Sequence, residues 1–254
     1  ASASPHRMAI LNGQMDLHMR AVPSTVERST LDAAAVLPSE YVTETARMKA
    51  MDVYKSCEKP FQKKHLRSPG LVVAASTVVS VGDELLTAPT STDDARAMLA
   101  KLSAAGTHSV QTGVALFYGG ADPDGADDGG EPYIHTFVEE TKVQFAPLTS
   151  EEIEAYVATG EPMARPGAYA LQGLGAAFVT GIEGDPQNVQ GFPVHRFCKE
   201  LDSTRLRNWL QSDPLLAAES QSNGADSAVD DSAALGKAAS IECGSMDECG
   251  LPSD

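Results

Sequence analysis

The sequence lacks an apolar stretch long enough to cross a membrane, because its longest one, residues 71–81, is interrupted by Ser76, Thr77 and Ser80. No long apolar segment marks a signal peptide near the N-terminus either, so we expect a cytoplasmic protein. Positive charge is scarce: 19 lysines and arginines stand against 35 aspartates and glutamates, a net charge of −16. Such a chain repels phosphate backbones, which argues against general nucleic-acid binding but still allows a small phosphorylated ligand.

Cysteine is rare as well, with Cys57, Cys198, Cys243 and Cys249 widely spread along the chain. The last two have the wrong spacing for a zinc knuckle and no histidine beside them, so we expect free thiols in a reducing compartment. The chain also begins without a methionine, and we expect a truncated or processed start.

The 254 residues, of which 42% are apolar, are enough for one sizeable domain with a normal core. We assign that domain to residues 1–210. Residues 211–254 hold nine acidic residues and one lysine, a net charge of −8, and are rich in Ala, Ser, Gly and Asp without periodicity. This tail is predicted to be disordered.

Hydrophobic periodicity and turn residues predict an alternation of helices and strands. Ser4 before Pro5 is a typical helix start, and Gly82-Asp83 is typical of a tight turn between strands. A glycine-rich acidic segment, 119–130, is predicted to be a solvated hairpin tip. Helices are predicted at 38–56, 92–102, 150–158 and 193–210, and strands at 71–79, 107–118, 133–145 and 176–182. The fold class is therefore α/β with a mixed sheet.

The segment around Gln172 is the strongest local sign of a binding site. Gln172 is followed by Gly173 and Gly175, just before the apolar run 176–179. A loop that only turns needs glycine or proline, but it does not need an amide side chain beside two glycines. This arrangement suits a pocket that recognises hydrogen-bond donors and acceptors on a flat ligand.

Short blocks spread over residues 1 to about 205 together resemble the Maf family of nucleoside triphosphate pyrophosphatases. Each block is weak alone, and their order along the chain makes the resemblance specific. The blocks are Ser-Ala-Ser-Pro-His-Arg at 2–7, Ala-Arg-Met-Lys-Ala at 46–50, Ala-Ser-Thr-Val-Val at 75–79, Ala-Met-Leu at 97–99, Leu-Ser at 102–103, Thr-His-Ser-Val at 107–110, Glu-Thr-Lys-Val at 140–143, Gly-Glu-Pro at 160–162, Gly-Ala-Tyr at 167–169, Gln-Gly-Leu-Gly at 172–175 and Gly-Phe-Pro at 191–193.

The resemblance implies an elongated α/β fold with two lobes around a central cleft, similar to that of the inosine triphosphatases. It implies cleavage of a nucleoside triphosphate between the α and β phosphates, with a divalent metal, Mg²⁺ or Mn²⁺. Thr77 and Gln172 match the branch of the family that acts on dTTP and UTP, so a pyrimidine nucleotide is the expected partner. A homodimer is a further expectation from the family.

The resemblance also suggests roles for particular side chains. Ser2, Ser4 and Arg7 are expected to hold phosphate oxygens, and Lys49 offers a point charge to the same oxygens. Glu27 matches the family's acidic position and is the candidate for holding a metal ion or a water molecule. Thr77 and Gln172 complete the expected substrate-binding set, Gln172 pairing with the edge of a pyrimidine.

Without the resemblance, simpler interpretations apply to several of these residues. Ser4 would only cap a helix, whereas Lys49 and Glu27 would be ordinary solvated charges. His108 is interpreted as a packing residue at the end of a strand rather than as a ligand.

The sequence departs from the family pattern at polar positions. Ser76 replaces the aspartate expected to be the catalytic base or metal ligand, and Ala88 replaces a lysine before proline. His6 replaces an arginine, and Ala-Arg-Pro at 164–166 replaces Asp-Lys-Ala. A serine cannot act as a general base near neutral pH without a partner.

These departures leave three hypotheses open. The first is a dTTP/UTP-type pyrophosphatase with weakened or rewired catalysis, in which Glu27 or His6 takes over part of the work. The second is a non-catalytic nucleotide-binding or interaction protein that keeps Arg7, Lys49, Thr77 and Gln172 for its ligand. The third is a purely structural partner that binds no nucleotide.

Overall fold

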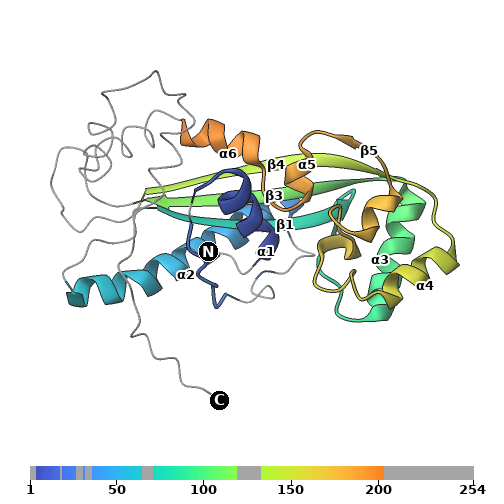
Figure 1. Cartoon of the computed structure of the whole chain (residues 1–254), viewed down its shortest axis with the longest axis horizontal. Coiled ribbons are helices and arrows are strands. Elements are labelled where there is room, and N and C mark those ends of the chain that lie inside the picture. The colour runs from blue at the N-terminus through green and yellow to red at the C-terminus, as the bar shows by residue number, and fades with distance from the viewer. Residues whose placement is uncertain are drawn as a thin grey trace, which may run out of the picture.

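The computed structural model describes residues 4–17, 19–26, 31, 36–64, 71–118 and 133–202, with residues 58–64 described by their backbone alone. These residues form an elongated molecule built on one sheet (Figure 1). The elements along the chain are α1 (Pro5–Met8), the π-helix η1 (Ala9–Gln14), α2 (Pro38–Lys64), β1 (Leu71–Val81), β2 (Glu84–Leu86), α3 (Thr92–Ala105), β3 (Thr107–Tyr118), β4 (Tyr133–Phe145), α4 (Ser150–Ala158), the 3-10 helices η3 (Pro166–Ala168) and η4 (Leu174–Phe178), β5 (Val179–Glu183), α5 (Pro186–Val189) and α6 (Val194–Leu201).

The sheet has five strands in the order β2-β1-β3-β4-β5. The predicted α/β class with flanking helices is confirmed, but every pair of neighbouring strands in this sheet is antiparallel, where we expected a mixed sheet. The reason lies in the connection between β1 and β3. Ser80, at the end of β1, pairs with Ser109, at the start of β3, so the chain re-enters the sheet at the end where it left. A parallel pair would need a crossover to the opposite end.

Strand β1 is buried on both faces, as its continuous apolar sequence predicts. On one face, Val72 and Ala74 pack with residues of α2, and on the other, Val73 and Ala75 pack with η1 and α6. Side chains alternate between the faces of a strand, so Ser76 lies on the α2 face and Thr77 on the face of the N-terminal helices.

The hairpin of β1 and β2 turns at Gly82, as predicted, but β2 is short. It pairs only with residues 79–81 of β1. Within the described part of the chain, no strand pairs with β1 on that side before Val79. Ser76 and Thr77 therefore lie at an open edge of the sheet, where side chains from both of its faces can reach the same space.

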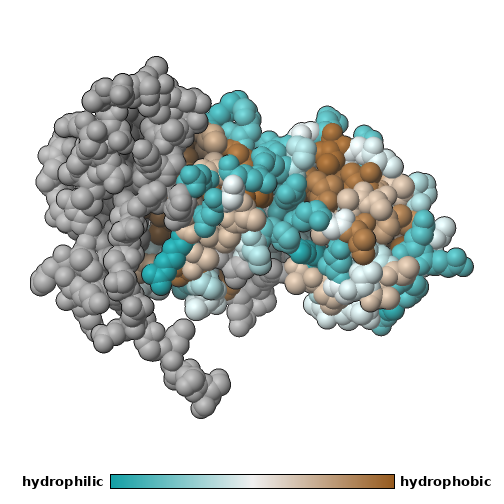
Figure 2. All heavy atoms as spheres, in the orientation of Figure 1, coloured by the Kyte–Doolittle hydropathy of each residue, from teal (hydrophilic) through white to brown (hydrophobic). Residues whose placement is uncertain are grey.

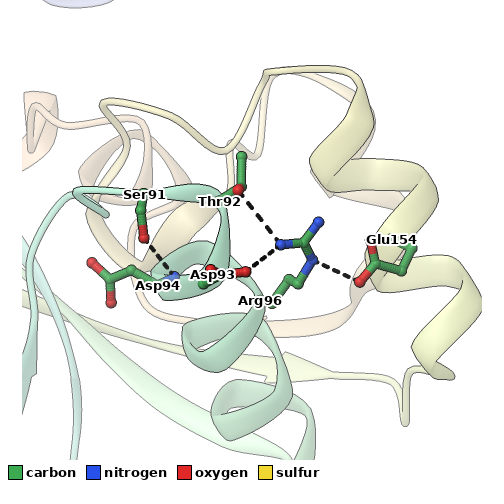
Figure 3. A network of polar contacts seen from close by, with 6 residues as sticks. All are labelled: Ser91, Thr92, Asp93, Asp94, Arg96 and Glu154. Atoms are coloured by element: carbon green, nitrogen blue, oxygen red, sulfur yellow. Dashed lines mark hydrogen bonds and ion pairs between the residues drawn. The ribbon is translucent and has the colours of Figure 1, made fainter.

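Helices α3 and α4 lie together at the far end of the sheet (Figure 1). Ser91 caps α3 by accepting a hydrogen bond from the backbone N–H of Asp94, and Arg96 contacts Asp93 and Glu154 of α4 (Figure 3). These ion pairs are solvent-exposed and contribute little to stability. The apolar cluster beneath them, which includes Leu99 and Tyr156, holds this end of the molecule together.

Helix α4 spans the predicted residues and begins with a capping box. Thr149, just before the predicted start, is the N-cap and forms a complete capping box with Glu152. The Thr149 hydroxyl accepts from the N–H of Glu152, and the Glu152 carboxylate accepts from the N–H of Thr149.

Other boundaries shift by a few residues. Helix α2 continues from the predicted end at 56 to Lys64, and α3 ends at Ala105 because Gly106 adopts a left-handed C-cap. The strand predicted over 176–182 begins only at Val179, since 174–178 form a 3-10 helix. Helix α6 spans Val194–Leu201, and residues 203–210 of the helix predicted over 193–210 lie outside the described residues.

Several predictions lie outside the described residues: the hairpin tip 119–130, the tail 211–254, Cys243 and Cys249. Cys57 and Cys198 are free thiols. None of the helices among the described residues combines the length and apolarity needed to cross a membrane. The domain boundary at 210 and the two-lobe arrangement stay predictions.

Candidate functional site

A cleft of about 560 Å³ lies at the open edge of β1. Its walls come from α1, Ser24 and Val26, α2, the middle of β1, Val110 of β3, residues 87–88 after β2, and two segments at 163–172 and 189–191. On the face of the molecule in Figure 2, hydrophilic residues predominate between the N-terminal helices and the α3–α4 end. The predicted site residues that line this cleft are Ser4, Arg7, Lys49, Ser76, Thr77 and Gln172.

Arg7 is held in place from two directions. Its Nε donates to the backbone oxygen of Gly191 at 2.8 Å, and its Nη2 donates to Thr77 Oγ1, also at 2.8 Å. Ser4 caps the short helix that carries Arg7, and Pro5 occupies the first helical position, as predicted. The guanidinium therefore enters the cleft with its orientation already fixed, which lowers the entropic cost of binding an anion.

The hydrogen bonds of Thr77 continue into the core. Its hydroxyl lies 2.9 Å from that of Thr112, which in turn donates to the backbone oxygen of Asn188 at 3.4 Å. Arginine can only donate, so the simplest chain of donors runs from Arg7 through Thr77 and Thr112 to Asn188. Thr77 thus positions Arg7, a role that the sequence did not indicate.

Asn188 is the fully buried anchor of this network. Its side-chain amide nitrogen lies 3.1–3.2 Å from the backbone oxygens of Val110 and Glu139 and from Thr141 Oγ1, and its two N–H groups are shared among these three acceptors. It thereby fixes α5, and with it Gly191, against β3 and β4. Sequence reasoning missed Asn188, because a single asparagine in a connecting segment carries no pattern that distinguishes it from a turn residue.

Lys49 reaches the cleft because α2 lies unusually close to the sheet. Gly113 of β3 pairs with Ser76, and a Cβ at Gly113 would lie 2.5 Å from the backbone carbon of Val42 in α2. Only glycine permits this approach. It sets the helix beside Ser76, so that Thr45 and Lys49 line the same cleft.

Gln172 stands on a loop that Glu161 holds in shape. The Glu161 carboxylate accepts hydrogen bonds from the backbone N–H groups of Leu174 and Gly175 and from the hydroxyl of Tyr156. Burial opposes ionisation of this carboxyl, but these hydrogen bonds outweigh it and lower the pKa of Glu161. The same loop replaces the first residues of the predicted strand with a 3-10 helix. Glu161 belongs to the recognised Gly-Glu-Pro block, although its positioning role was not predicted.

The positions that depart from the family pattern also line the cleft. Ser76 is nearly buried beside α2, and Ala88 lies where the chain leaves β2. Neither side chain carries a charge. Among the described residues that line the cleft there is no aspartate or glutamate.

His6 and Arg165 meet inside the cleft. Arg165 Nη2 lies 2.7 Å from His6 Nε2. An arginine N–H donates, so this nitrogen of His6 must accept and carries no proton. Burial, and then the positive charge of Arg165, lower the pKa of His6. The sequence identified both positions only as departures from the family and did not predict their contact.

The described residues do not by themselves form a metal site. Across the described ranges, no group of three or more His, Cys, Asp or Glu side chains is arranged to hold a metal ion. Mg²⁺ is usually held by one or two carboxylates together with substrate phosphates, and the described lining contains no carboxylate. Glu27, the predicted metal ligand, and Ser2 lie outside the described residues, so their roles stay predictions.

His108 is a packing residue, as interpreted from the sequence. It is 3% exposed, its Nε2 lies 2.8 Å from the Tyr169 hydroxyl, and its ring packs edge-on against Phe145. Burial lowers the pKa of His108 to about 4, so the ring is neutral at physiological pH.

Fold and site together define an α/β protein with a cationic cleft at the open edge of an antiparallel sheet. A family model described as Maf-like protein matches residues 1–204. The chain belongs to this family.

Curated relatives cover the same region. The chain is 40% identical over 204 residues to the dTTP/UTP pyrophosphatase of Halalkalibacterium halodurans, a match of 79% of this chain and 92% of that protein. It is 38% identical over 194 residues to the dTTP/UTP pyrophosphatase of Thermococcus onnurineus, covering 76% of this chain and 90% of the relative. A human protein named probable bifunctional dTTP/UTP pyrophosphatase/methyltransferase is 39% identical over 201 residues, but the match spans only 31% of its length.

Proposed function

We propose that the chain is a nucleoside triphosphate pyrophosphatase that binds dTTP- and UTP-type nucleotides in the cleft at the β1 edge and releases the monophosphate and pyrophosphate. The supporting observation is that every predicted site residue within the described ranges lines this one cleft. Relatives that this chain matches over more than 90% of their length carry the name dTTP/UTP pyrophosphatase.

The cleft offers a distinct contact for each part of such a nucleotide. Arg7 and Lys49 supply positive charge for the phosphate oxygens, with Arg7 oriented by Thr77. Gln172 supplies one donor and one acceptor for the edge of a pyrimidine, on a loop that Glu161 holds in place. Ser4 and Ser2 complete the set proposed to surround the phosphates.

Catalysis is proposed to be weaker than a complete family site would give. Ser76 supplies no base, and losing a positioned base costs about 10²- to 10⁴-fold in rate. Ala88 supplies no cation for the negative charge that develops on the phosphate. Removing one such donor by itself lowers the rate by about 10²- to 10³-fold. Glu27 is the remaining candidate for activating water.

The absence of carboxylates from the described lining also favours a second candidate, a nucleotide-binding protein without turnover. Both candidates predict binding of a pyrimidine triphosphate, and they differ in chemistry. A metal ion and a homodimer accompany the first candidate as expectations from the family, and the cytoplasmic location stays an expectation from the N-terminal sequence.

The deciding experiment measures pyrophosphate release from dTTP and UTP with Mg²⁺ or Mn²⁺. Turnover by the natural chain that is lost in a Glu27→Ala variant supports the enzyme. Strong activity that appears only in a Ser76→Asp, Ala88→Lys double variant refutes the enzyme and supports binding alone. A thermal shift with dTTP separates both from a purely structural role, which predicts no shift.

A further inference from the structure

The contact between His6 and Arg165 is unusual because it contains no carboxylate. It joins α1 to the segment at 163–166, residues 159 positions apart in sequence, through a 2.7 Å hydrogen bond. Both residues line the cleft. The guanidinium is thus held there by a neutral imidazole, which is a far weaker partner for a cation than an anionic oxygen would be.

The groups around this pair favour an incoming anion. Arg7 of α1 and Lys49 of α2 add positive charge to the same cleft. Tyr41 of α2 and Tyr169 also line it, and the Tyr169 hydroxyl is paired with His108. Within the described lining no acidic side chain faces the pair. Glu161 interacts electrostatically with Arg165, but its oxygens already accept from two backbone N–H groups and a tyrosine.

We propose that His6 and Arg165 form a clamp for the triphosphate, in which a phosphate oxygen displaces Nε2 of His6 as the acceptor for Arg165 and His6 takes up one proton from solvent as the ligand binds. This inference rests on the proposed function, because it assumes that the ligand of the cleft is a nucleotide.

The proton balance follows from the geometry. In the free protein, Nε2 accepts from Arg165 and carries no proton. When Arg165 turns to a phosphate oxygen, Nε2 loses its donor and gains a negative neighbour. A proton on Nε2 then makes a second charge-assisted hydrogen bond to phosphate. Two residues that hold each other in the empty cleft become two donors in the filled one.

Calorimetry tests the proposal directly. A pyrimidine triphosphate analogue with a non-hydrolysable α–β bridge is titrated into the full chain near pH 7.5, in buffers with different ionisation enthalpies. The dependence of the heat on the buffer gives the number of protons taken up. The same titration is run on His6→Asn, which removes the titrating group, and on His6→Arg, which carries a permanent charge.

We expect the natural chain to take up as much as about one proton more than either variant. Its affinity relative to His6→Asn rises as pH falls from about 8 to 6, by up to about tenfold per pH unit. His6→Arg binds at least as tightly as the natural chain, without the extra proton. Because all three proteins meet the same ligand, the titration of the phosphate itself cancels in the comparison.

Equal proton uptake by the natural chain and His6→Asn, with both binding the analogue, overturns the clamp and leaves the proposed function intact. Absence of binding by all three proteins at every pH overturns the proposed function and the clamp together. Thermal melting without ligand confirms that the variants are folded.

Discussion

Replacing Thr77 with valine tests whether the hydroxyl of this residue holds Arg7 in place. Valine keeps the shape of threonine but removes the oxygen that lies 2.8 Å from Arg7 Nη2 and 2.9 Å from Thr112 Oγ1. A hydrogen bond from a charged donor contributes about 1.5–3 kcal/mol, and one between neutral groups about 1 kcal/mol. Since Arg7 and Thr77 are only partly buried, we expect a net loss near the lower end, about 2 kcal/mol of unfolding free energy.

Urea unfolding measures this loss, and a decrease of about 1 M in the midpoint corresponds to it. Binding of the same non-hydrolysable analogue should weaken by about tenfold, which is about 1.4 kcal/mol, because Arg7 must then be oriented at the expense of binding. Thr77→Ser is the matched control, because it keeps the hydroxyl. If Thr77→Val and Thr77→Ser unfold and bind alike, the hydroxyl does not position Arg7 and the reasoning fails.

Three further predictions concern the parts that surround the cleft. In the folded state the pKa of His108 is depressed to about 4, whereas in the unfolded chain it is about 6.5. The neutral ring therefore stabilises the fold at pH values above 6.5, and this contribution disappears as the pH falls from 6.5 to 4. Urea unfolding at pH 7 and 4.5 should therefore show a loss of up to about 3 kcal/mol that is smaller in His108→Gln. Gly113→Ala should lower the unfolding free energy by about 1–3 kcal/mol or more, because the added Cβ would overlap the backbone of Val42. A Cβ at Gly13 would meet nothing within 4 Å, so Gly13→Ala should lower it much less in the same assay. Glu161→Gln should weaken analogue binding measured by calorimetry, since the Gln172 loop loses charged hydrogen bonds, and an unchanged affinity would contradict the positioning role. The unfolding free energy of this variant should also fall less than that of the natural chain below about pH 4.5. The reason is that the depressed pKa of Glu161 stabilises the fold only above that range.

Local patterns predicted most of the elements of this fold. The long alternating strands at 107–118 and 133–145 and the helix at 150–158 agree with the structure at both ends. Where prediction failed, a contact distant in sequence decided the outcome. The start of β5 is delayed because Glu161 holds the backbone at 174–175, and the antiparallel course of β3 depends on where the chain re-enters the sheet.

The site was predictable in its members but not in its internal contacts. Resemblance to the family identified residues such as Arg7 and Gln172, which do line one cleft. It could not identify the bond between His6 and Arg165, because both positions depart from the family pattern. Nor could it identify Asn188, whose role depends on buried backbone oxygens that no sequence pattern exposes.

The sequence after β2 explains why this strand pairs with so little of β1. Continuing the register of Val79 with Leu86 would bring Ala88 opposite Thr77 and Pro89 opposite Ser76. Proline has no N–H to donate, so the hairpin cannot zip onward past this point. Pro89 thus prevents β2 from pairing along the middle of β1. The point where this hairpin ends therefore determines how much of the β1 edge is left open for a ligand.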